Sequence, residues 1–141
     1  MAGDSHSLHL EAKTACLGRA VDFVRRGAEE ASLPPERAGE LELVIEELFV
    51  NICHHAYPES HPGAVAVSYC IPSPGELNLE LADQGVEFNP LQSADPDINV
   101  ELQLRPIGGL GIFLVKRLAK SLAYSREDGW NRLRFGISSG S

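Results

Sequence analysis

The spacing of apolar residues in the first part of the chain predicts two helices. From Thr14 to about Ala31, apolar side chains recur every three or four residues, which is the period of an amphipathic helix. Pro34 interrupts this pattern, because proline lacks an amide hydrogen and restricts the residue before it. Proline is tolerated in a first helical turn, so a second helix can begin near Pro35 and end at Tyr57. Its apolar stripe consists of Leu41, Val44, Ile45, Leu48, Phe49, Ile52 and Ala56.

Strands are predicted where the period changes to two. Apolar residues alternate with smaller or polar ones over 65–71 and again over 77–81, and a turn at 72–75 separates the two segments. Because strands joined by a tight turn pair antiparallel, these segments should form a hairpin. Residues 7–10 are a further short strand.

The last third of the chain predicts a helix followed by a second pair of strands. Residues 110–122 place apolar side chains on one helical face. A Glu-Asp-Gly turn at 127–129 joins strands at 122–126 and 130–137. One face of the last strand carries Asn131, Leu133, Phe135 and Ile137. We therefore expect an α+β fold, a two-layer sandwich in which helices cover one face of a mixed, mostly antiparallel sheet.

Composition limits the class of protein. A chain of 141 residues with 43% hydrophobic and 23% charged residues predicts one globular domain over residues 1–141. No apolar run approaches the roughly 20 residues of a membrane helix, and the first residues do not form a signal peptide. Cys16, Cys53 and Cys70 are odd in number and form no C-x-x-C motif. We interpret them as buried free thiols in a reducing cytoplasm.

The charge is unevenly distributed. From Arg105 onward there are seven Lys and Arg against two acidic residues, a net charge of +5, which leaves −13 of the total of −8 to the residues before it. The acidic part argues against a nucleic-acid binder, which would carry a broad basic face. The basic third either faces an anion such as a phosphate chain or forms an ordinary solvated surface.

Glu47 and Asn51 are four residues apart, so they lie one above the other on the second predicted helix. An Asn amide oxygen suits Mg²⁺, which takes few protein ligands beside substrate phosphates. A carboxylate one turn away can accept a proton from water or an attacking hydroxyl. Glu46 lies on the opposite flank of the apolar stripe. Taken alone, the pair is also compatible with an ordinary partly solvated helix face.

The segment Asp83-Gln84-Gly85 follows a strand of alternating leucines. A carboxylate at the end of that strand can accept from the exocyclic amine of adenine, and Gly85, which has no Cβ, allows the backbone to approach a flat base. Phe88 can pack against such a base or under the loop. Alternatively, Asp-x-Gly is a common polar turn.

Glycines precede the helix predicted in the last third. Gly108, Gly109 and Gly111 surround Leu110 at the start of that helix. Exposed amides and the positive end of the helix dipole make such a turn a general anion site. The pattern is neither a Rossmann fingerprint nor a P-loop. A tight loop-to-helix joint without a ligand explains the glycines equally well.

His54 and His55 are the remaining candidate metal ligands. Adjacent histidines on a helix point about 100° apart and cannot share one ion. A structural histidine is favoured at position 55, although a metal hydrolase built on these two residues and Asp83 is a remote alternative.

Taken together, three segments resemble the boxes of the GHKL superfamily, the histidine-kinase-like ATPases. Residues 47–57, with their His-Ala-Tyr ending, resemble the N-box, residues 83–90 the G1 box and residues 108–115 the G2 box. Residues 124–126 and 129–133 resemble the closing hairpin. The closest likeness is to the bacterial anti-sigma factor serine/threonine kinases.

This resemblance, which extends from about Leu8 to Ile137, implies a Bergerat-type fold that binds ATP and Mg²⁺. By position, Asn51 would hold Mg²⁺ and Glu47 would be the general base. Asp83 would contact the adenine amine, with Gly85 beside the base. The nucleotide-binding residues would also include Phe88, Arg105, Gly108, Gly109, Leu110 and Gly111.

The resemblance also implies a lid and protein partners. The lid would be about 91–107, within the least regular part of the chain, and its well-placed cation is Arg105. The implied activity is transfer of phosphate to a serine or threonine of a small anti-sigma factor antagonist, with sequestration of a sigma factor, in the cytoplasm. Kinases of this family are often homodimers. A non-catalytic ATP-binding module that captures a partner is the alternative.

Overall fold

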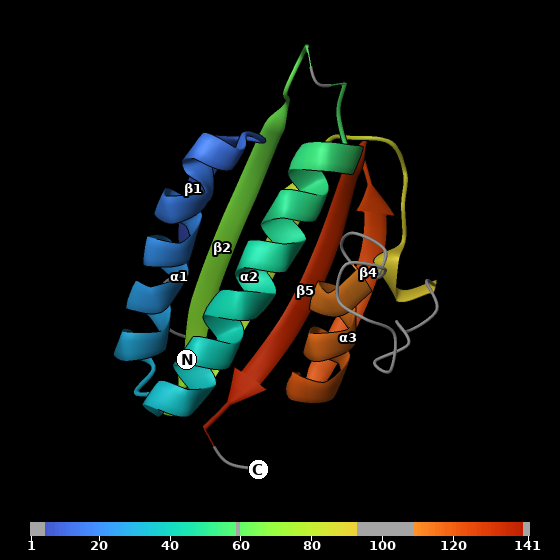
Figure 1. Cartoon of the computed structure of the whole chain (residues 1–141). Helices are drawn as coiled ribbons and strands as arrows, with labels where there is room; N and C mark the ends of the chain where they lie inside the picture. The colour runs from blue at the N-terminus through green and yellow to red at the C-terminus, as the bar shows by residue number, and fades with distance from the viewer. Residues whose placement is uncertain (1–4, 59, 93–108, 140–141) are drawn as a thin grey trace, which may run out of the picture.

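Helices cover one face of a five-stranded sheet in the computed structural model, which describes residues 5–58, 60–92 and 109–139 (Figure 1). The strands are β1 (His6–Glu11), β2 (Ala64–Ser73), β3 (Glu76–Asp83), β4 (Ser121–Glu127) and β5 (Trp130–Ser138). The helices are α1 (Leu17–Glu30), α2 (Pro35–His55) and α3 (Gly109–Leu118), with single 3-10 turns η1 (Thr14–Cys16) and η2 (Pro90–Gln92).

The strand order is β1-β2-β3-β5-β4, and all four neighbouring pairs of described strands are antiparallel. The predicted two-layer α+β sandwich is confirmed. The expectation that part of the sheet would be mixed is corrected. β3 and β4 run in the same direction, but β5 lies between them, so these two strands do not form a parallel pair.

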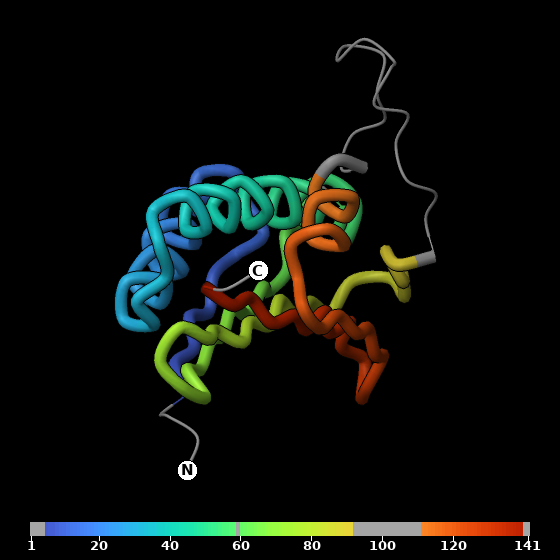
Figure 2. Tube along the Cα trace, turned by 90° about the horizontal axis from the view of Figure 1, so that it is seen from below, coloured from blue at the N-terminus to red at the C-terminus, as the bar shows by residue number. Residues whose placement is uncertain are grey.

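The core lies between the sheet and the helix layer, which Figure 2 shows from one end. α2 is placed between α1 and α3 and packs against both (Figure 1). Five residues of its predicted stripe, Leu41, Val44, Ile45, Leu48 and Phe49, are buried. Alternate residues of the central strands meet them, namely Val65, Val67, Leu77, Leu79, Leu81, Leu133, Phe135 and Ile137. The predicted periods of helix and strand are therefore confirmed by burial.

Two element boundaries differ by three residues or more from those expected. α1 begins at Leu17, after the short turn η1, instead of at Thr14. α3 ends at Leu118 rather than at Leu122, because the backbone amide of Lys120 already donates to a β5 carbonyl at 2.8 Å. Leu122 is paired with Phe135 in the sheet. Its apolar side chain fits the helical period and the strand period equally well, so the pattern could not separate them.

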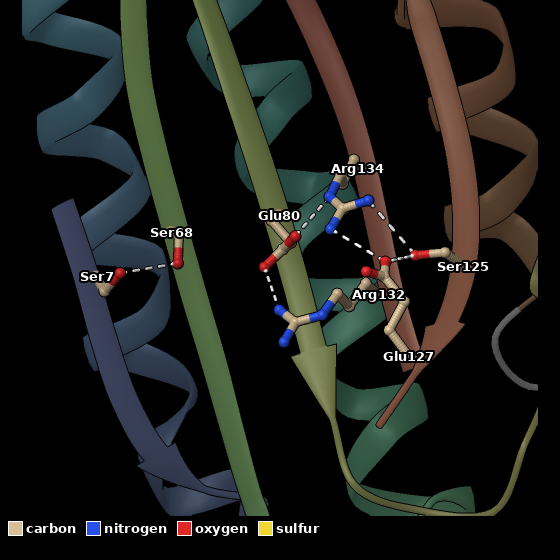
Figure 3. A network of polar contacts seen from close by, with 7 residues as sticks. All are labelled: Ser7, Ser68, Glu80, Ser125, Glu127, Arg132 and Arg134. Atoms are coloured by element: carbon tan, nitrogen blue, oxygen red, sulfur yellow. Dashed lines mark hydrogen bonds and ion pairs between the residues drawn. The ribbon is translucent and has the colours of Figure 1, made fainter. Parts of the chain in front are cut away.

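The face of the sheet opposite the helices carries a polar network (Figure 3). The Glu80 carboxylate of β3 accepts from Arg132 at 3.0 Å and from Arg134 at 2.7 Å, both on β5. Arg134 also donates to Glu127 and to Ser125 of β4. Two residues of the basic third are thus ion-paired on this face. Within the described ranges, no helix is long and apolar enough to cross a membrane.

Candidate functional site

α2 presents the first pair of predicted site residues. Glu47 and Asn51 are half-buried beside the core stripe, whereas Glu46 is exposed. The helix that holds them begins at Pro35, where a missing amide hydrogen costs nothing. Between residues that the structure describes, no hydrogen bond or ion pair involves the side chain of Glu47 or Asn51. Their carboxylate and amide oxygens therefore accept no hydrogen bond from any described residue.

The first turn of α3 packs directly on Glu47. A Cβ added at Gly111 would lie 2.5 Å from the Glu47 Cβ and 3.4 Å from the Leu48 amide nitrogen, so only glycine permits this approach. The buried residues Ile112 and Val115 hold the rest of α3 against the core. The glycine-rich turn and the Glu47–Asn51 face are therefore adjacent, as the sequence predicted. The structure places Gly109 and Leu110 in the first turn of this helix.

The loop that follows β3 packs against the end of α2. The Val86 amide donates to the Ala56 carbonyl at 3.3 Å. A Cβ at Gly85 would lie 2.3 Å from that carbonyl oxygen. The predicted need for glycine at this position is thus explained by contact with α2, while its approach to a base stays a prediction. Gly85 and Gly111 bring the second and third motifs to the same helix.

Tyr57 fixes the start of this loop. Its hydroxyl donates to the Ala64 carbonyl and accepts from the Gln84 amide, both at 2.6 Å. Burial raises the pKa of the Tyr57 hydroxyl, which therefore keeps its proton at neutral pH. The sequence pointed to Tyr57 only as the end of a helix and of a motif.

Asp83, the last residue of β3, is 8% exposed. Its Oδ1 accepts from the Gly85 amide at 2.9 Å and from Asn131 Nδ2 at 3.0 Å. The first of these bonds is the ordinary Asp turn, so the alternative interpretation of Asp-x-Gly also holds. Oδ2 receives no hydrogen bond from any described residue. One carboxylate oxygen thus orients the side chain, and the other is left to accept from a ligand.

Asn131 is a residue of this site that the sequence did not identify. It lies on β5 opposite Asp83 and is 7% exposed. It also contacts the loop, because its Nδ2 donates to the Val86 carbonyl at 2.8 Å. The sequence did contain a signal: Asn131 is the polar member of an otherwise apolar buried stripe, and buried amides are almost always hydrogen-bonded.

Phe88 and Val86 form the rim of the loop, with 50% and 68% of their surfaces exposed. Phe88 is therefore not packed under the loop, and contact with a base stays a prediction. Arg126 of β4 donates to the Gly85 carbonyl at 2.7 Å. Arg105, Gly108 and nearly all of the predicted lid, residues 93–107, lie outside the described residues.

The structure does not support the metal-hydrolase alternative. His54 and His55 are both exposed, and their ring centroids are 6.3 Å apart. Among the described residues, no group of three His, Cys, Asp or Glu side chains could hold a metal ion. The cysteines are free, as predicted, but all three are half-buried rather than buried. Burial raises the pKa of the Cys53 thiol, which disfavours the reactive thiolate.

Comparison with known protein families and curated sequences agrees with this geometry. A family model described as a histidine kinase-like ATPase domain matches residues 10–137. The chain is 33% identical over 93 residues to the serine/threonine-protein kinase BtrW of Bordetella bronchiseptica, a match that covers 66% of this chain and 65% of BtrW. It is 26% identical over 106 residues to the serine-protein kinase RsbW of Listeria monocytogenes, covering 72% and 67%. The match to BtrW thus spans just under two thirds of that relative.

Solved structures show the same fold. The RsbU and RsbW domains of Rv1364c from Mycobacterium tuberculosis superpose with a TM-score of 0.65 at 12% identity, covering 96% of this chain and 32% of that one. The blue-light activated histidine kinase of Erythrobacter litoralis EL346 gives 0.56 at 18% identity, covering 89% and 41%. With the family model matched over most of its length, the chain belongs to the histidine kinase-like ATPase family.

Proposed function

We propose that this chain is an ATP-dependent serine/threonine protein kinase of the anti-sigma factor type. It would phosphorylate a small antagonist protein and sequester a sigma factor. One structural observation carries the proposal: all three motifs belong to α2 or pack on it, through Gly111 at Glu47 and Gly85 at Ala56. The relatives named serine kinases give independent support.

The polar groups that meet around α2 fit ATP and Mg²⁺. The Asn51 amide oxygen is a hard ligand suited to Mg²⁺, which completes its shell with water and phosphate oxygens and needs no cluster of protein carboxylates. The free Oδ2 of Asp83 is an acceptor for the adenine amine. Backbone amides in the first turn of α3 would face the phosphates.

Glu47 is the residue we assign to proton transfer. When the serine hydroxyl of a partner attacks the γ-phosphorus of ATP, its proton would pass to the Glu47 carboxylate as the new O–P bond forms and ADP leaves. Bound Mg²⁺ would neutralise charge on the phosphates. Half-burial on α2 and close packing of Gly111 on its Cβ keep Glu47 beside the first turn of α3, where those phosphates would lie.

The test is phosphate transfer from γ-labelled ATP with Mg²⁺ to small antagonist proteins, sought first among the products of the adjacent genes. Glu47→Gln should slow transfer by about 100-fold to 10,000-fold and leave ATP affinity within roughly threefold, because it removes only the base. Glu46→Gln is the matched control, since Glu46 is exposed on the other flank of the same helix. It should behave as the wild type.

The competing function is a nucleotide-dependent binding module without chemistry. It predicts that the partner is captured, that no label reaches any serine or threonine, and that Glu47→Gln changes nothing. That result would replace the kinase proposal while keeping the ATP site. Absence of ATP binding in calorimetry would remove both.

A further inference from the structure

We propose that Asn131, supported by Tyr124, is a positioning residue that makes the site selective for a purine with a 6-amino group. It would act through Asp83, holding its carboxylate so that Oδ2 meets the amine. The inference rests on the proposed function, in which Asp83 contacts adenine. It adds a residue outside the three sequence motifs and assigns base selectivity to it.

The carboxamide of Asn131 uses all four of its hydrogen-bonding positions. Nδ2 donates to Asp83 Oδ1 at 3.0 Å and to the Val86 carbonyl at 2.8 Å. Oδ1 accepts from the Tyr124 hydroxyl at 2.6 Å and from the Phe88 amide at 3.3 Å. An amide has two donors and two acceptor lone pairs, so this group is fully satisfied. Reversing it would direct an N–H group at the Phe88 amide and the amide oxygen at two acceptors, Asp83 Oδ1 and the Val86 carbonyl, which fixes its orientation.

The consequence for Asp83 is that one oxygen is fixed and the other is not. Two donors bond to Oδ1: the Gly85 amide, two residues further along the chain, and Asn131 on the neighbouring strand β5. The contact is built by the sheet, since Asp83 and Asn131 are direct partners in the β3–β5 register. The carboxylate therefore cannot rotate without breaking hydrogen bonds between buried groups, since Asp83 is 8% and Asn131 7% exposed.

Asn131 also fixes the loop on the far side of Asp83. The Val86 carbonyl and the Phe88 amide bond to the same side chain, so residues 86–88 are tied to β5. A single carboxamide thus sets the distance between the carboxylate and the loop rim. The space for the base is defined by this residue even though it need not touch the base.

A preorganised acceptor discriminates strongly against a ligand that lacks the matching donor. The decisive experiment compares ATP with purine riboside triphosphate, which has hydrogen in place of the 6-amino group. The wild type should prefer ATP by about 10-fold to 100-fold, the range for a hydrogen bond to a charged group. In Asn131→Leu, which keeps the volume but loses the donors, we expect the preference to fall to about threefold or less.

The ratio of the affinities for ATP and purine riboside triphosphate is informative, because a purely structural role of Asn131 would lower both affinities equally. Tyr124→Phe is the second variant, since it keeps the ring and removes only the hydroxyl that donates to Asn131. It should reduce the preference at least about threefold, and it decides the question if Asn131→Leu does not fold. Ser125→Ala is the matched control, because Ser125 neighbours Tyr124 on β4 and belongs to the polar network of the open face. Its preference should equal that of the wild type.

The possible failures are distinguishable. If the wild type binds neither triphosphate, the proposed function is wrong and this inference falls with it. If the wild type prefers ATP and Asp83→Ala removes that preference, while Asn131→Leu or a folded Tyr124→Phe keeps it, only the inference about Asn131 is overturned. A loss of preference in both variants, with Ser125→Ala unchanged, supports it.

Discussion

The two ends of the proposed nucleotide site, which we name the base end and the phosphate end, are held in different ways. At the base end, the 83–88 loop is tied by side chains of the β4–β5 hairpin, with Asn131 and Arg126 bonded to it directly. At the phosphate end, the side chains of Glu47 and Asn51 have no hydrogen bond to another described residue, and close packing of Gly111 on Glu47 is what positions α3 there. The base end combines side-chain hydrogen bonds with the close packing of Gly85 on Ala56, whereas the phosphate end shows only close packing among the described residues.

This difference suggests that the two ends have different roles in ligand binding. A hydrogen-bonded end is complete before a ligand arrives, and it can discriminate between bases at no further ordering cost. Uncommitted carboxylate and amide groups suit the end where a metal, phosphates and a hydroxyl must be bound. Base-end substitutions should therefore weaken every adenine ligand equally, whereas phosphate-end substitutions should affect only ligands with phosphates.

Asp83→Ala tests the base end and should have the largest effect. It removes the proposed contact to the amine and leaves the Asn131 and Gly85 donors without their acceptor. We expect calorimetry to show a loss of roughly 100-fold for ATP, ADP and adenosine alike, with or without Mg²⁺. Glu80→Gln is the control on the same strand, on the opposite face of the sheet. A loss confined to Mg²⁺-ATP would contradict the comparison.

Gly111→Ala tests the steric fit of the phosphate end. The new methyl group would overlap Glu47, so α3 must shift, and we expect a loss of about 1–3 kcal/mol in the free energy of unfolding in urea. Gly39→Ala is the matched control, since this α2 glycine has no atom within 4 Å of an added Cβ. It should be stabilising by about 0.5–1 kcal/mol. Equal effects at the two glycines would show that the Gly111 contact is unimportant.

The elements defined by local periodicity were predicted well from sequence. The stripe of α2 and the alternating strands around it are buried as expected, because burial on one face imposes the period directly. The site residues Glu47 and Asn51 share a turn of α2 for the same local reason. The larger boundary errors were the start of α1, where a short turn precedes the helix, and the end of α3 near Leu118, where one leucine satisfied two periods.

The sequence could not predict how the site is supported. Asn131 is 48 residues from Asp83, and their pairing depends on β5 entering the sheet between β3 and β4. No local pattern specifies that strand order. Likewise, no pattern in the sequence indicated that Gly85 would pack against the Ala56 carbonyl, while its approach to a base stays a prediction. Residue types predict the chemistry of a site, and strand register determines which other residues hold it in place.

Asn51→Ala tests the metal at the phosphate end. We expect the affinity for ATP to fall about 10-fold in the presence of Mg²⁺, as for loss of a group that supports a metal. With EDTA, and for adenosine at any Mg²⁺ concentration, the variant should equal the wild type. Asn78→Ala on β3, an exposed asparagine, provides the control. If adenosine binding also fell, Asn51 would belong to the base end instead.

Arg126→Leu should give the smallest effect, because it removes one bond at the edge of the base end. The guanidinium donates to the Gly85 carbonyl at 2.7 Å from an exposed position, so water can replace it in part. We expect adenosine and ATP affinities to fall equally, by about two- to fivefold. Arg134→Leu, which disrupts an ion pair on the open face, should leave both affinities unchanged. A larger loss of affinity for ATP than for adenosine would mean that Arg126 acts on the phosphates and belongs to the phosphate end instead of the base end.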